Sequence, residues 1–431
     1  MSRPALYHVA TLGCKLNQFD SATMEADLVA MGMAPTPDAA AARVVVVNTC
    51  TVTSAADAQS RQLVRRIRRA NPRCTLIVTG CYAQRDPAAL EGIPGVDAVV
   101  GLAGQKALKS LMVKLVPEIP EELACIEAAE DPLPFFSDQT RAFLKIQEGC
   151  DLHCSYCVIP SVRGASRSIE PDRVLKKIRL LAEAGFREVV FTGVNTGDYG
   201  KDLDPPTTLA ALLRRASEIP ELGRLRLNSV EPKCLTEDLV ETMAGTSKIA
   251  PHVQVPLQSG SDAALARMRR PYRTSHYRRA LEAIRGKIPE AGLGADVIVG
   301  FPGETEEEFR QTRDFIASSE LNYLHVFSFT PRPGTPAAEA PNPVRGDVIR
   351  ERNATLRALG TDLAHRFRSS FLNRELEVLG LKQTLPDGSV RALSGNFIDV
   401  ALRGDPAACV NRLLRARVTG VSPERVRAVP C

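Results

Sequence analysis

The residues best suited to chemistry in this sequence are three cysteines within one stretch of eight residues. Cys150, Cys154 and Cys157 stand in the order Cys-Asp-Leu-His-Cys-Ser-Tyr-Cys. Thiolates are soft ligands that favour zinc, copper(I) or iron–sulfur clusters. A structural zinc ion takes four ligands, and a cubane iron–sulfur cluster normally takes four cysteines. Three local thiolates therefore predict a cluster in which one iron stays open for a substrate or cofactor.

Three other cysteines, Cys14, Cys50 and Cys81, each follow a predicted strand in the first part of the chain. The predicted strands are short apolar runs at residues 5–12, 43–48 and 75–79. They alternate with helical patterns, which predicts a parallel sheet with helices on its faces. The carboxyl ends of parallel strands share one edge, where ligands bind. We therefore expect a second three-thiol site, with buried free cysteines as the alternative.

Several neighbouring residues are expected to be structural. Asn17 can cap a helix that runs to about residue 31. Cys74 lies at the amino end of its strand, on the opposite edge, and is expected in the core. His153 is expected at the surface or in packing, because zinc sites with this spacing are the less common alternative.

Between residue 139 and about residue 368 the alternation of strands and helices continues. The predicted strands are 142–147, 188–192, 225–228, 253–257, 294–299 and 324–328. Six such units predict a partial, open parallel barrel, short of the eight units of a closed one. Function in such barrels gathers at the carboxyl ends of the strands, and Cys150 follows the first strand directly.

Other strand ends carry glycine with neutral polar residues, at 192–197, 256–261 and 300–304. Glycine allows close backbone approach, and Asn, Gln and Ser supply hydrogen bonds. Each segment is weak evidence alone, since glycine after a strand mostly marks a turn. Thr305 and Glu308 have the spacing of a capping box that opens a helix.

Arginine is dense in two helical segments. One, at about 55–70, carries Arg61, Arg65, Arg66, Arg68 and Arg69. The other, at 267–279, interleaves six arginines with Tyr272 and Tyr277. Guanidiniums with stacking rings suit RNA phosphates and bases. Solvated helix faces are an equally good interpretation.

The remaining features bound the domains and the compartment. We expect domains at 1–137, 138–369 and 370–431, with a proline- and acid-containing link at about 117–139. The last domain reads as a small β-barrel, a shape often used to hold nucleic acid, with a hairpin at Pro386-Asp387-Gly388. No apolar run is long enough to span a membrane. Eleven cysteines, an odd number, argue against a disulfide framework. A cytoplasmic protein is expected.

The cysteine motif after the first strand of a six-unit barrel resembles the radical S-adenosylmethionine (SAM) superfamily. The segments 11–17, 48–53, 79–81 and 147–164 resemble its methylthiotransferase branch, and the C-terminal barrel is similar to that branch's TRAM domain. The resemblance covers nearly the whole chain. It implies an α/β protein with an N-terminal Rossmann-like parallel-sheet domain, a partial (βα)6 radical SAM barrel and a small C-terminal β-barrel.

The resemblance also implies two [4Fe-4S] clusters and SAM. Cys150, Cys154 and Cys157 would be the catalytic set, binding SAM and cleaving it to a 5′-deoxyadenosyl radical. Cys14, Cys50 and Cys81 would hold the second cluster, which carries the sulfur. Tyr156 matches the aromatic position beside the SAM adenine. The further SAM contacts would be Thr192, Gly193, Asn195 and Gln258, although Thr192-Gly-Val-Asn195 departs from the Gly-Gly-Glu of many members.

Within the branch, the segments after Cys14 and Cys50 look most like enzymes that act on N6-threonylcarbamoyladenosine (t6A) at position 37 of the tRNA anticodon loop. The alternatives are isopentenyladenosine in tRNA and an aspartate of ribosomal protein S12. An external electron donor such as a flavodoxin or ferredoxin is implied, while the sulfur source is left open. A non-catalytic iron–sulfur RNA-binding protein is the alternative from another class.

Overall fold

The computed structural model describes residues 4–116, 133, 134, 136 and 139–431. It separates into two compact units, and each is described by itself. Unit 1 comprises Met1–Ser137 and Cys157–Ala165, and unit 2 comprises Asp138–Tyr156 and Ser166–Cys431. The link expected at about 117–139, with the boundary near residue 137, lies almost wholly outside the described residues.

Unit 1 is built on a parallel sheet with the strand order β2-β1-β3-β4-β5. The strands are β1 (Leu6–Thr11), β2 (Ala34–Pro35), β3 (Val44–Thr49), β4 (Thr75–Gly80) and β5 (Ala98–Val100). Every residue of β3 and β4 is buried, as expected for central parallel strands covered on both faces. The edge strands β2 and β5 are absent from the sequence prediction, because they are only two and three residues long.

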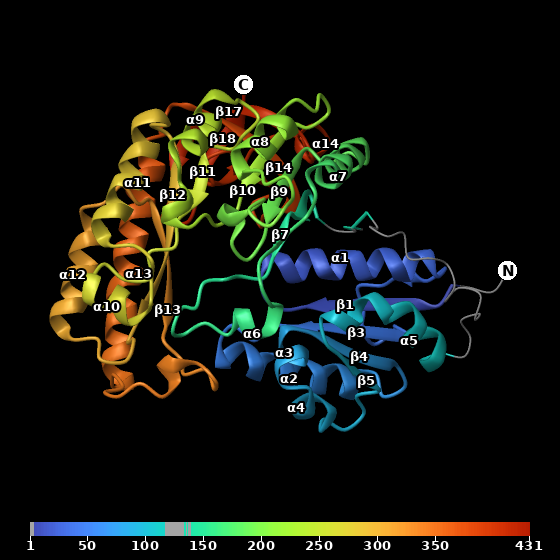
Figure 1. Ribbon diagram of the computed structural model, residues 1–431. Helices are drawn as coiled ribbons and strands as arrows, with labels where there is room; N and C mark the ends of the chain where they lie inside the picture. Colours follow the sequence, from blue (N-terminus) through green and yellow to red (C-terminus); the bar gives the residue numbers. More distant parts are fainter. Residues whose placement is uncertain (1–3, 117–132, 135, 137–138) are drawn as a thin grey trace. The chain divides into compact units, whose positions relative to one another are not determined.

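Helices cover both faces of this sheet (Figure 1). They are α1 (Lys15–Ala30), α2 (Ser54–Ala70), α3 (Cys81–Arg85), α4 (Pro87–Glu91) and α5 (Leu108–Leu115). Met24 and Leu28 of α1 and Met112 of α5 pack on one face. Val64 of α2 and Leu90 of α4 pack on the other. The predicted parallel-sheet domain is confirmed.

One expectation for α1 is wrong. The helix begins after Cys14, and Asn17 lies inside its first turn and not at the cap. Asn17 is fully buried, and its amide donates to the carbonyl oxygens of Leu12 (2.7 Å) and Thr49 (2.9 Å). The side chain thus satisfies two loop carbonyls at the strand ends, a tertiary role that local capping rules do not foresee.

A segment distant in sequence completes unit 1. The short helix α6 (Ile159–Arg163) packs Val158 and Val162 against Cys81. The Arg163 guanidinium, almost fully buried, donates to Oδ1 of Asn17 (2.8 Å) and Oδ2 of Asp20 (3.0 Å). A buried charge of this kind needs a partner, so Arg163 fastens the residues after the cysteine motif to α1.

The first part of unit 2 holds two three-stranded parallel sheets, β6-β9-β10 and β11-β12-β13. The strands are β6 (Arg141–Lys145), β9 (Glu188–Thr192), β10 (Arg224–Leu227), β11 (His252–Gln254), β12 (Gly292–Val299) and β13 (Tyr323–Ser328). Bridges from Leu225 to Ile249 and from Ser229 to Gln254 join the two sheets. The result is the predicted partial barrel of six strands.

Seven helices lie along these strands (Figure 1): α7 (Pro171–Glu183), α8 (Leu209–Ser217), α9 (Glu237–Gly245), α10 (Asp262–Arg267), α11 (Thr274–Lys287), α12 (Glu306–Ala317) and α13 (Gly346–Ser369). A small antiparallel pair consists of β7 (Gln147–Glu148) and β8 (Arg167–Ser168). In the sequence, β7 precedes the cysteine motif and β8 follows α6.

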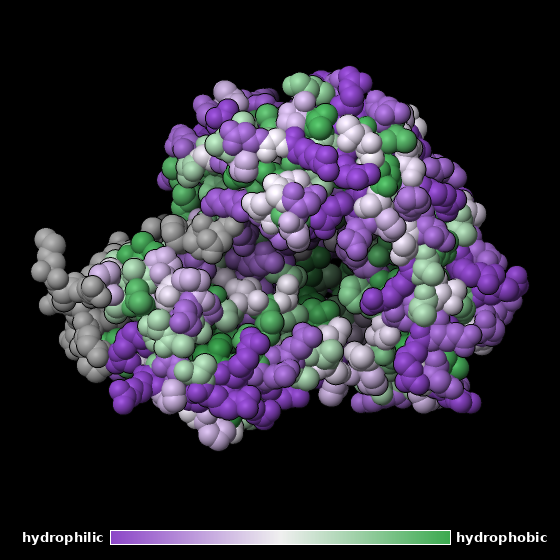
Figure 2. All heavy atoms as spheres, turned by 180° about the vertical axis from the view of Figure 1, so that it is seen from behind, coloured by the Kyte–Doolittle hydropathy of each residue, from purple (hydrophilic) through white to green (hydrophobic). Residues whose placement is uncertain are grey.

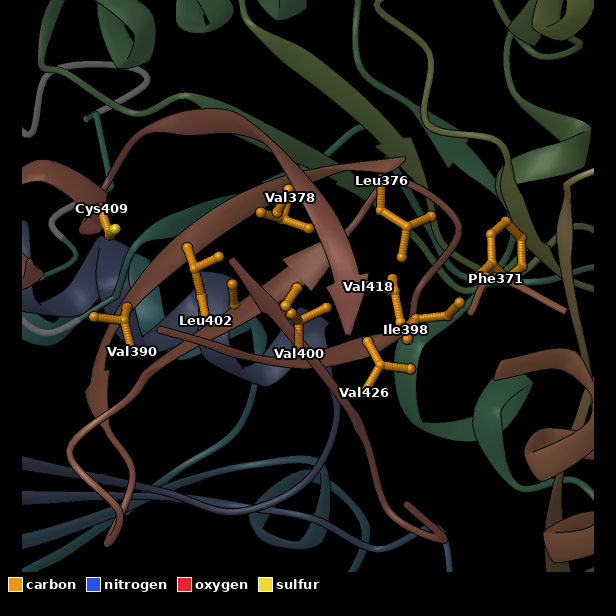
Figure 3. Close-up of a cluster of buried hydrophobic side chains, with 13 residues drawn as sticks. Phe371, Leu376, Val378, Val390, Ile398, Val400, Leu402, Cys409, Val418 and Val426 are labelled. Carbon is orange, nitrogen blue, oxygen red and sulfur yellow. The ribbon is translucent and has the colours of Figure 1, made fainter. Parts of the chain in front are cut away.

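The C-terminal part of unit 2 is a closed barrel with the order β14-β15-β16-β18-β17. Its elements are β14 (Glu375–Thr384), β15 (Val390–Ser394), β16 (Asp399–Leu402), α14 (Pro406–Cys409), β17 (Leu413–Val421) and β18 (Val426–Pro430). Figure 3 shows Val378, Val400 and Val418 among the side chains that fill its interior. The predicted hairpin joins β14 to β15, with Gly388 at φ +80°. The sequence prediction lacks β18.

A buried ionic cluster joins the two parts of unit 2. Glu188 of β9 is fully buried and accepts hydrogen bonds from Arg226 (2.9 Å) and Arg224 (3.1 Å) of β10. Arg226 also donates to the carbonyls of Gly395 and Ser394, and Arg224 to that of Glu377. Burial would raise the pKa of Glu188, but Arg226, Arg224 and Arg141 hold that pKa at about 2.

The face of the molecule seen in Figure 2 is mostly polar. On the face seen in Figure 2, hydrophilic side chains cover most of the outer surface, and hydrophobic ones appear singly or in small groups. Within the described residues, every helix is too short or too polar to cross a membrane.

We predict that Glu188→Gln destabilises unit 2 by about 3–5 kcal/mol at pH 7, because it removes the carboxylate paired with the buried Arg226 and one of the two carboxylates paired with Arg224. The Glu188 carboxyl has a lowered pKa in the folded state, so its stabilisation is present above about pH 4.5 and is lost as the pH falls towards 2. Urea unfolding from pH 7 to pH 3 should show the wild type approaching the variant as acid is added. Exposed Glu218→Gln is the control and should change little at any pH.

We also predict that Arg163→Met lowers the free energy of opening of α1 and α6 by about 3–5 kcal/mol, because the buried carboxylate of Asp20 loses its ion pair with this guanidinium. Hydrogen exchange followed by mass spectrometry would report this in peptides from residues 15–30 and 157–165. Adding Asp20→Leu should restore much of the protection. Unchanged exchange in the single variant would contradict the role given to the pair.

Candidate metal and cofactor sites

In unit 1 the predicted thiols follow three adjacent strands. Cys14 comes after β1, Cys50 directly after β3 and Cys81 directly after β4. The register pairs Thr49 with Gly80, so Cys50 and Cys81 leave the sheet side by side. The structure thus brings the ends of all three strands to one edge, as parallel topology requires.

Gly13 allows the loop after β1 to approach Cys50. Its φ is +105°, and a Cβ atom there would lie 2.8 Å from the Cβ and 3.0 Å from the Sγ of Cys50. Any other residue would be strained and would push the loop away. The close approach of Cys14 to the other two thiols therefore depends on this glycine.

The three thiols are electrostatically coupled. Burial raises the pKa of Cys81 to about 12, Arg163 opposes the increase, and Cys14 and Cys50 add to it. Burial likewise raises the pKa of Cys50, with a contribution from Cys14. Metal ligation requires thiolates, so loading this edge releases protons. The guanidinium of Arg163 lowers the pKa of Cys81 and so can balance the negative charge of a thiolate there.

The surroundings of Cys81 show how this positive charge is held. Asn17 places its Oδ1 atom 3.7 Å from the Sγ of Cys81 and 2.8 Å from Arg163. Asp20 neutralises the same guanidinium from the side of α1. None of Asn17, Asp20 and Arg163 was singled out from sequence as part of a site. The only available signal was the position of Arg163 directly after the cysteine motif.

The donor set decides which metal group fits. Within the described ranges, no three His, Cys, Asp or Glu side chains are close enough together to share one metal ion. A cubane offers a separate iron to each thiolate, so its ligands stand further apart than those of a single zinc ion. Three soft thiols at one sheet edge fit such a cluster.

The loop with the other three cysteines is fixed in unit 2 through Ser155. Its N–H donates to the carbonyl of Met268 (3.1 Å), and its hydroxyl donates to that of Arg267 (2.8 Å). Its own carbonyl accepts from the N–H of Ala337 (2.8 Å). Cys150 and Cys154 are buried on either side of an exposed His153, which agrees with the surface position expected for this histidine.

The third motif cysteine belongs to the other unit. Cys157 is half-buried, is grouped with unit 1, and accepts a hydrogen bond at Sγ from the N–H of Ile159 (3.4 Å). In unit 2, burial raises the pKa of Cys150, while the N–H of Leu152 donates to its Sγ (3.4 Å) and lowers it.

Arg270 is a site residue that the sequence did not identify. Its Nη1 donates to the Sγ of Cys154 (3.0 Å), and it also pairs with Glu231 and contacts the hydroxyl of Tyr272. From the sequence, Arg270 is one of six arginines at 267–279 that are possible RNA contacts. Because the guanidinium is buried and donates to the Sγ of Cys154, it is held in the interior and does not reach a phosphate.

The rest of that arginine-rich segment divides in the same way. Tyr272 and Tyr277 are buried, so neither ring can stack on a base, and the packed-helix alternative holds for both. Arg267 pairs with Glu308, whereas Arg269, Arg273 and Arg279 are exposed. On α2, Arg65, Arg66 and Arg69 are exposed, while Arg68 pairs with Asp97.

The expected SAM contacts lie around the same loop. Tyr156 packs edge-on against Phe301, with ring centroids 6.5 Å apart. Gly193 approaches Gln147, whose Oε1 accepts from the N–H of Asn195 (2.9 Å). Gln258 has φ +64°, lies four residues after the end of β11 and forms an isolated bridge to Val297 of β12.

Two buried oxygen atoms at and just after the end of β9 have the chemistry to bind a polar ligand. In the described part of the chain, Oγ1 of Thr192 and Oδ1 of Asn195 have no hydrogen-bond partner. Leaving a buried polar atom unpaired costs about 1–3 kcal/mol. Neutral acceptors and a hydroxyl at this strand end suit a polar group such as the amino acid part of SAM.

The segment 300–304 is better explained by structure. Oε2 of Glu304 accepts from the N–H of Gly300 (2.8 Å) and from Arg352 (2.7 Å). The capping box of Thr305 and Glu308 is present as expected. Cys74 is buried in the core of unit 1, also as expected.

Comparison with known proteins places this geometry in a family. Residues 6–101 match the family described as "Uncharacterized protein family UPF0004", and residues 144–316 match the "Radical SAM superfamily". A solved structure of the radical S-adenosylmethionine methyltransferase TsrM from Kitasatospora setae shares the fold. Its TM-score is 0.58 at 16% identity, and the similarity covers 78% of this chain and 77% of that one.

Two curated relatives match nearly the whole chain. Threonylcarbamoyladenosine tRNA methylthiotransferase MtaB of Bacillus subtilis (strain 168) is 37% identical over 91% of this chain and 89% of its own length. A tRNA-2-methylthio-N(6)-dimethylallyladenosine synthase of Acidothermus cellulolyticus (strain ATCC 43068 / DSM 8971 / 11B) is 35% identical over 99% of this chain and 86% of its own. The cysteines at the strand ends, the partial barrel and these matches together show that the chain belongs to the radical SAM tRNA methylthiotransferase family.

Proposed function

We propose that this protein is a tRNA-modifying enzyme that attaches a methylthio group to C2 of t6A at position 37. The observation that carries the proposal is the convergence of Cys14, Cys50 and Cys81 at one sheet edge, in a chain that has a second three-cysteine motif. One reactive cluster explains radical chemistry on its own. A second set of thiols is needed to deliver sulfur.

The proposed cofactors are two [4Fe-4S] clusters and SAM. Cys14, Cys50 and Cys81 would hold one cluster, and Cys150, Cys154 and Cys157 the other. When bound, these groups would supply the methylthio group and the one-electron chemistry that reaction at an unactivated C–H bond requires. Each cluster keeps one iron without a protein ligand, since each cysteine set has three members.

The chain's own residues position and balance these groups. Arg270 donates to Cys154, and Arg163 lies against Cys81, so each cysteine set has one buried guanidinium beside it. Hydrogen bonds to cluster sulfurs tune reduction potential. Tyr156 would border the SAM adenine, and Thr192, Gly193, Asn195 and Gln258 its polar part. An external flavodoxin or ferredoxin would supply electrons.

The choice of t6A rests on the amino-acid sequences around Cys14 and Cys50. Relatives named for t6A and for dimethylallyladenosine match this chain at similar identity. The segments Gly13-Cys-Lys-Leu-Asn-Gln18 and Asn48-Thr-Cys-Thr-Val-Thr53 favour t6A. Both lie at the edge where the sulfur-bearing cluster is proposed.

Iron content tests the two sites. Anaerobically reconstituted wild type should hold about eight irons per chain, and Cys81→Ala or Cys154→Ala about four. The variants should differ in chemistry, because only Cys154→Ala should abolish release of 5′-deoxyadenosine on reduction. Cys74→Ala is the matched control, a buried cysteine of the same sheet at the opposite edge, and it should keep both clusters. Release of 5′-deoxyadenosine by Cys154→Ala would contradict the assignment.

The substrate is tested by nucleoside mass spectrometry of tRNA from a strain that lacks this gene. The methylthio form of t6A should disappear, with unmodified t6A in its place, while methylthiolated isopentenyladenosine and ribosomal protein S12 stay unchanged. Loss of either of those instead would replace the proposed substrate. Unchanged tRNA and S12, together with absence of 5′-deoxyadenosine release, would favour a non-catalytic iron–sulfur protein.

A further inference from the structure

The inner face of β12 and β13 carries a row of side chains that the proposed cluster and SAM sites do not use. On β13, Leu324 faces the covering helix, because a Cβ on Gly360 of α13 would lie 3.1 Å from the Cβ of Leu324. Side chains alternate along a strand. His325 and Phe327 therefore point to the other side, into the partial barrel.

The register of the two strands extends this face. Asp296 pairs with His325, and Ile298 with Phe327, so all four side chains share one surface. Ile298 packs in the same hydrophobic cluster as Tyr156 and Phe301. Since Tyr156 follows Cys154 by two residues, the face begins beside the cysteine loop and continues away from it, within unit 2.

Hydrogen bonds hold the polar part of this face in place. The amide nitrogen of Gln254 lies 2.6 Å from Oδ1 of Asp296 and 2.9 Å from Nδ1 of His325. His325 Nδ1 also lies 3.2 Å from Oδ1 of Asp296. Tyr323 donates to Oε1 of Gln254 (3.1 Å) and bonds His252 (2.7 Å), which fixes the direction of the amide. Such a network is organised before any ligand arrives.

The network keeps hydrogen-bonding capacity for a ligand. Both contacts of His325 use Nδ1, which either accepts from the Gln254 amide or donates to Asp296, according to the tautomer. Nε2 remains available to a ligand, as a donor in the first tautomer and as an acceptor in the second. Its side chain is 49% exposed, and that of Asp296 is 23% exposed. A ring nitrogen and a carboxylate side by side can read the edge of a nucleobase.

Phe327 supplies the complementary surface. It is 43% exposed although it faces the inside of the barrel, and among the described residues it is the only aromatic with a large exposed area. Exposed rings next to polar groups are how proteins bind unstacked RNA bases. Enzymes that react with a base must first take it out of its stack.

We propose that the target purine base of the tRNA binds on this face, with its ring against Phe327 and one edge hydrogen-bonded to His325 and Asp296. The inference rests on the proposed function, in which a carbon of that base reacts beside the cysteine loop. It assigns base recognition to residues of β12 and β13.

The test uses the reconstituted holoenzyme and two anticodon stem-loop RNAs, one with adenosine at position 37 and one with an abasic site there. For wild type, the abasic RNA should bind more weakly. Phe327→Ala should weaken binding of the adenosine RNA by about 5- to 150-fold, the range for one base stacked on an aromatic ring, and leave the abasic RNA unaffected. Phe327→Tyr should restore binding, and His325→Ala should show the same selective loss.

Controls separate this inference from the proposed function. Leu372→Ala removes a similarly exposed hydrophobic side chain of unit 2 and should bind both RNAs as wild type does. Iron content and SAM cleavage without RNA should be normal in Phe327→Ala. If Phe327→Ala weakened both RNAs equally, or neither, base recognition on this face would be wrong while tRNA modification could stand. Failure of wild type to bind either RNA would overturn both.

Discussion

The constraint on which the rest of the structure depends is the parallel order of β1, β3 and β4. Parallel strands end at a common edge, so three cysteines separated by dozens of residues leave the sheet together. Gly13 then lets the loop with Cys14 lie against Cys50. Inverting any one strand would send its cysteine to the opposite edge, where Cys74 lies, and the three cysteines would no longer lie together.

Buried arginines recur wherever the fold must hold a charge or join two parts. Arg163 links α6 to α1 and lies beside Cys81, and Arg270 donates to Cys154. Arg224 and Arg226 connect the partial barrel to the closed barrel through Glu188 and backbone carbonyls. A guanidinium suits these places because its planar fork satisfies several acceptors at once and keeps its charge when buried.

The same logic separates the arginines by role. Those that find carboxylates, thiols or carbonyls in the interior are held there by these partners, whereas others on α2 and around α10 and α11 are left exposed. In the interior of unit 2, the face proposed for the target base is made instead of polar and aromatic side chains on β12 and β13. In that proposal, exposed guanidiniums would serve affinity for RNA, and ring stacking with a fixed hydrogen-bond network would serve selection of one base.

The sequence by itself determined the fold class, the cysteine sets and their strand ends, because apolar periodicity and thiol spacing are local patterns. It also separated Cys74 from the site, since strand direction is readable from the alternation. Only the tertiary structure decided the rest. Asn17 left its expected cap to bind loop carbonyls, and Arg270 turned inward to the Sγ of Cys154. Cys157–Ala165 joined unit 1, and His325 and Phe327 faced the barrel interior. Those outcomes depend on which distant side chain supplies a partner for a buried polar group, and no local pattern encodes that choice.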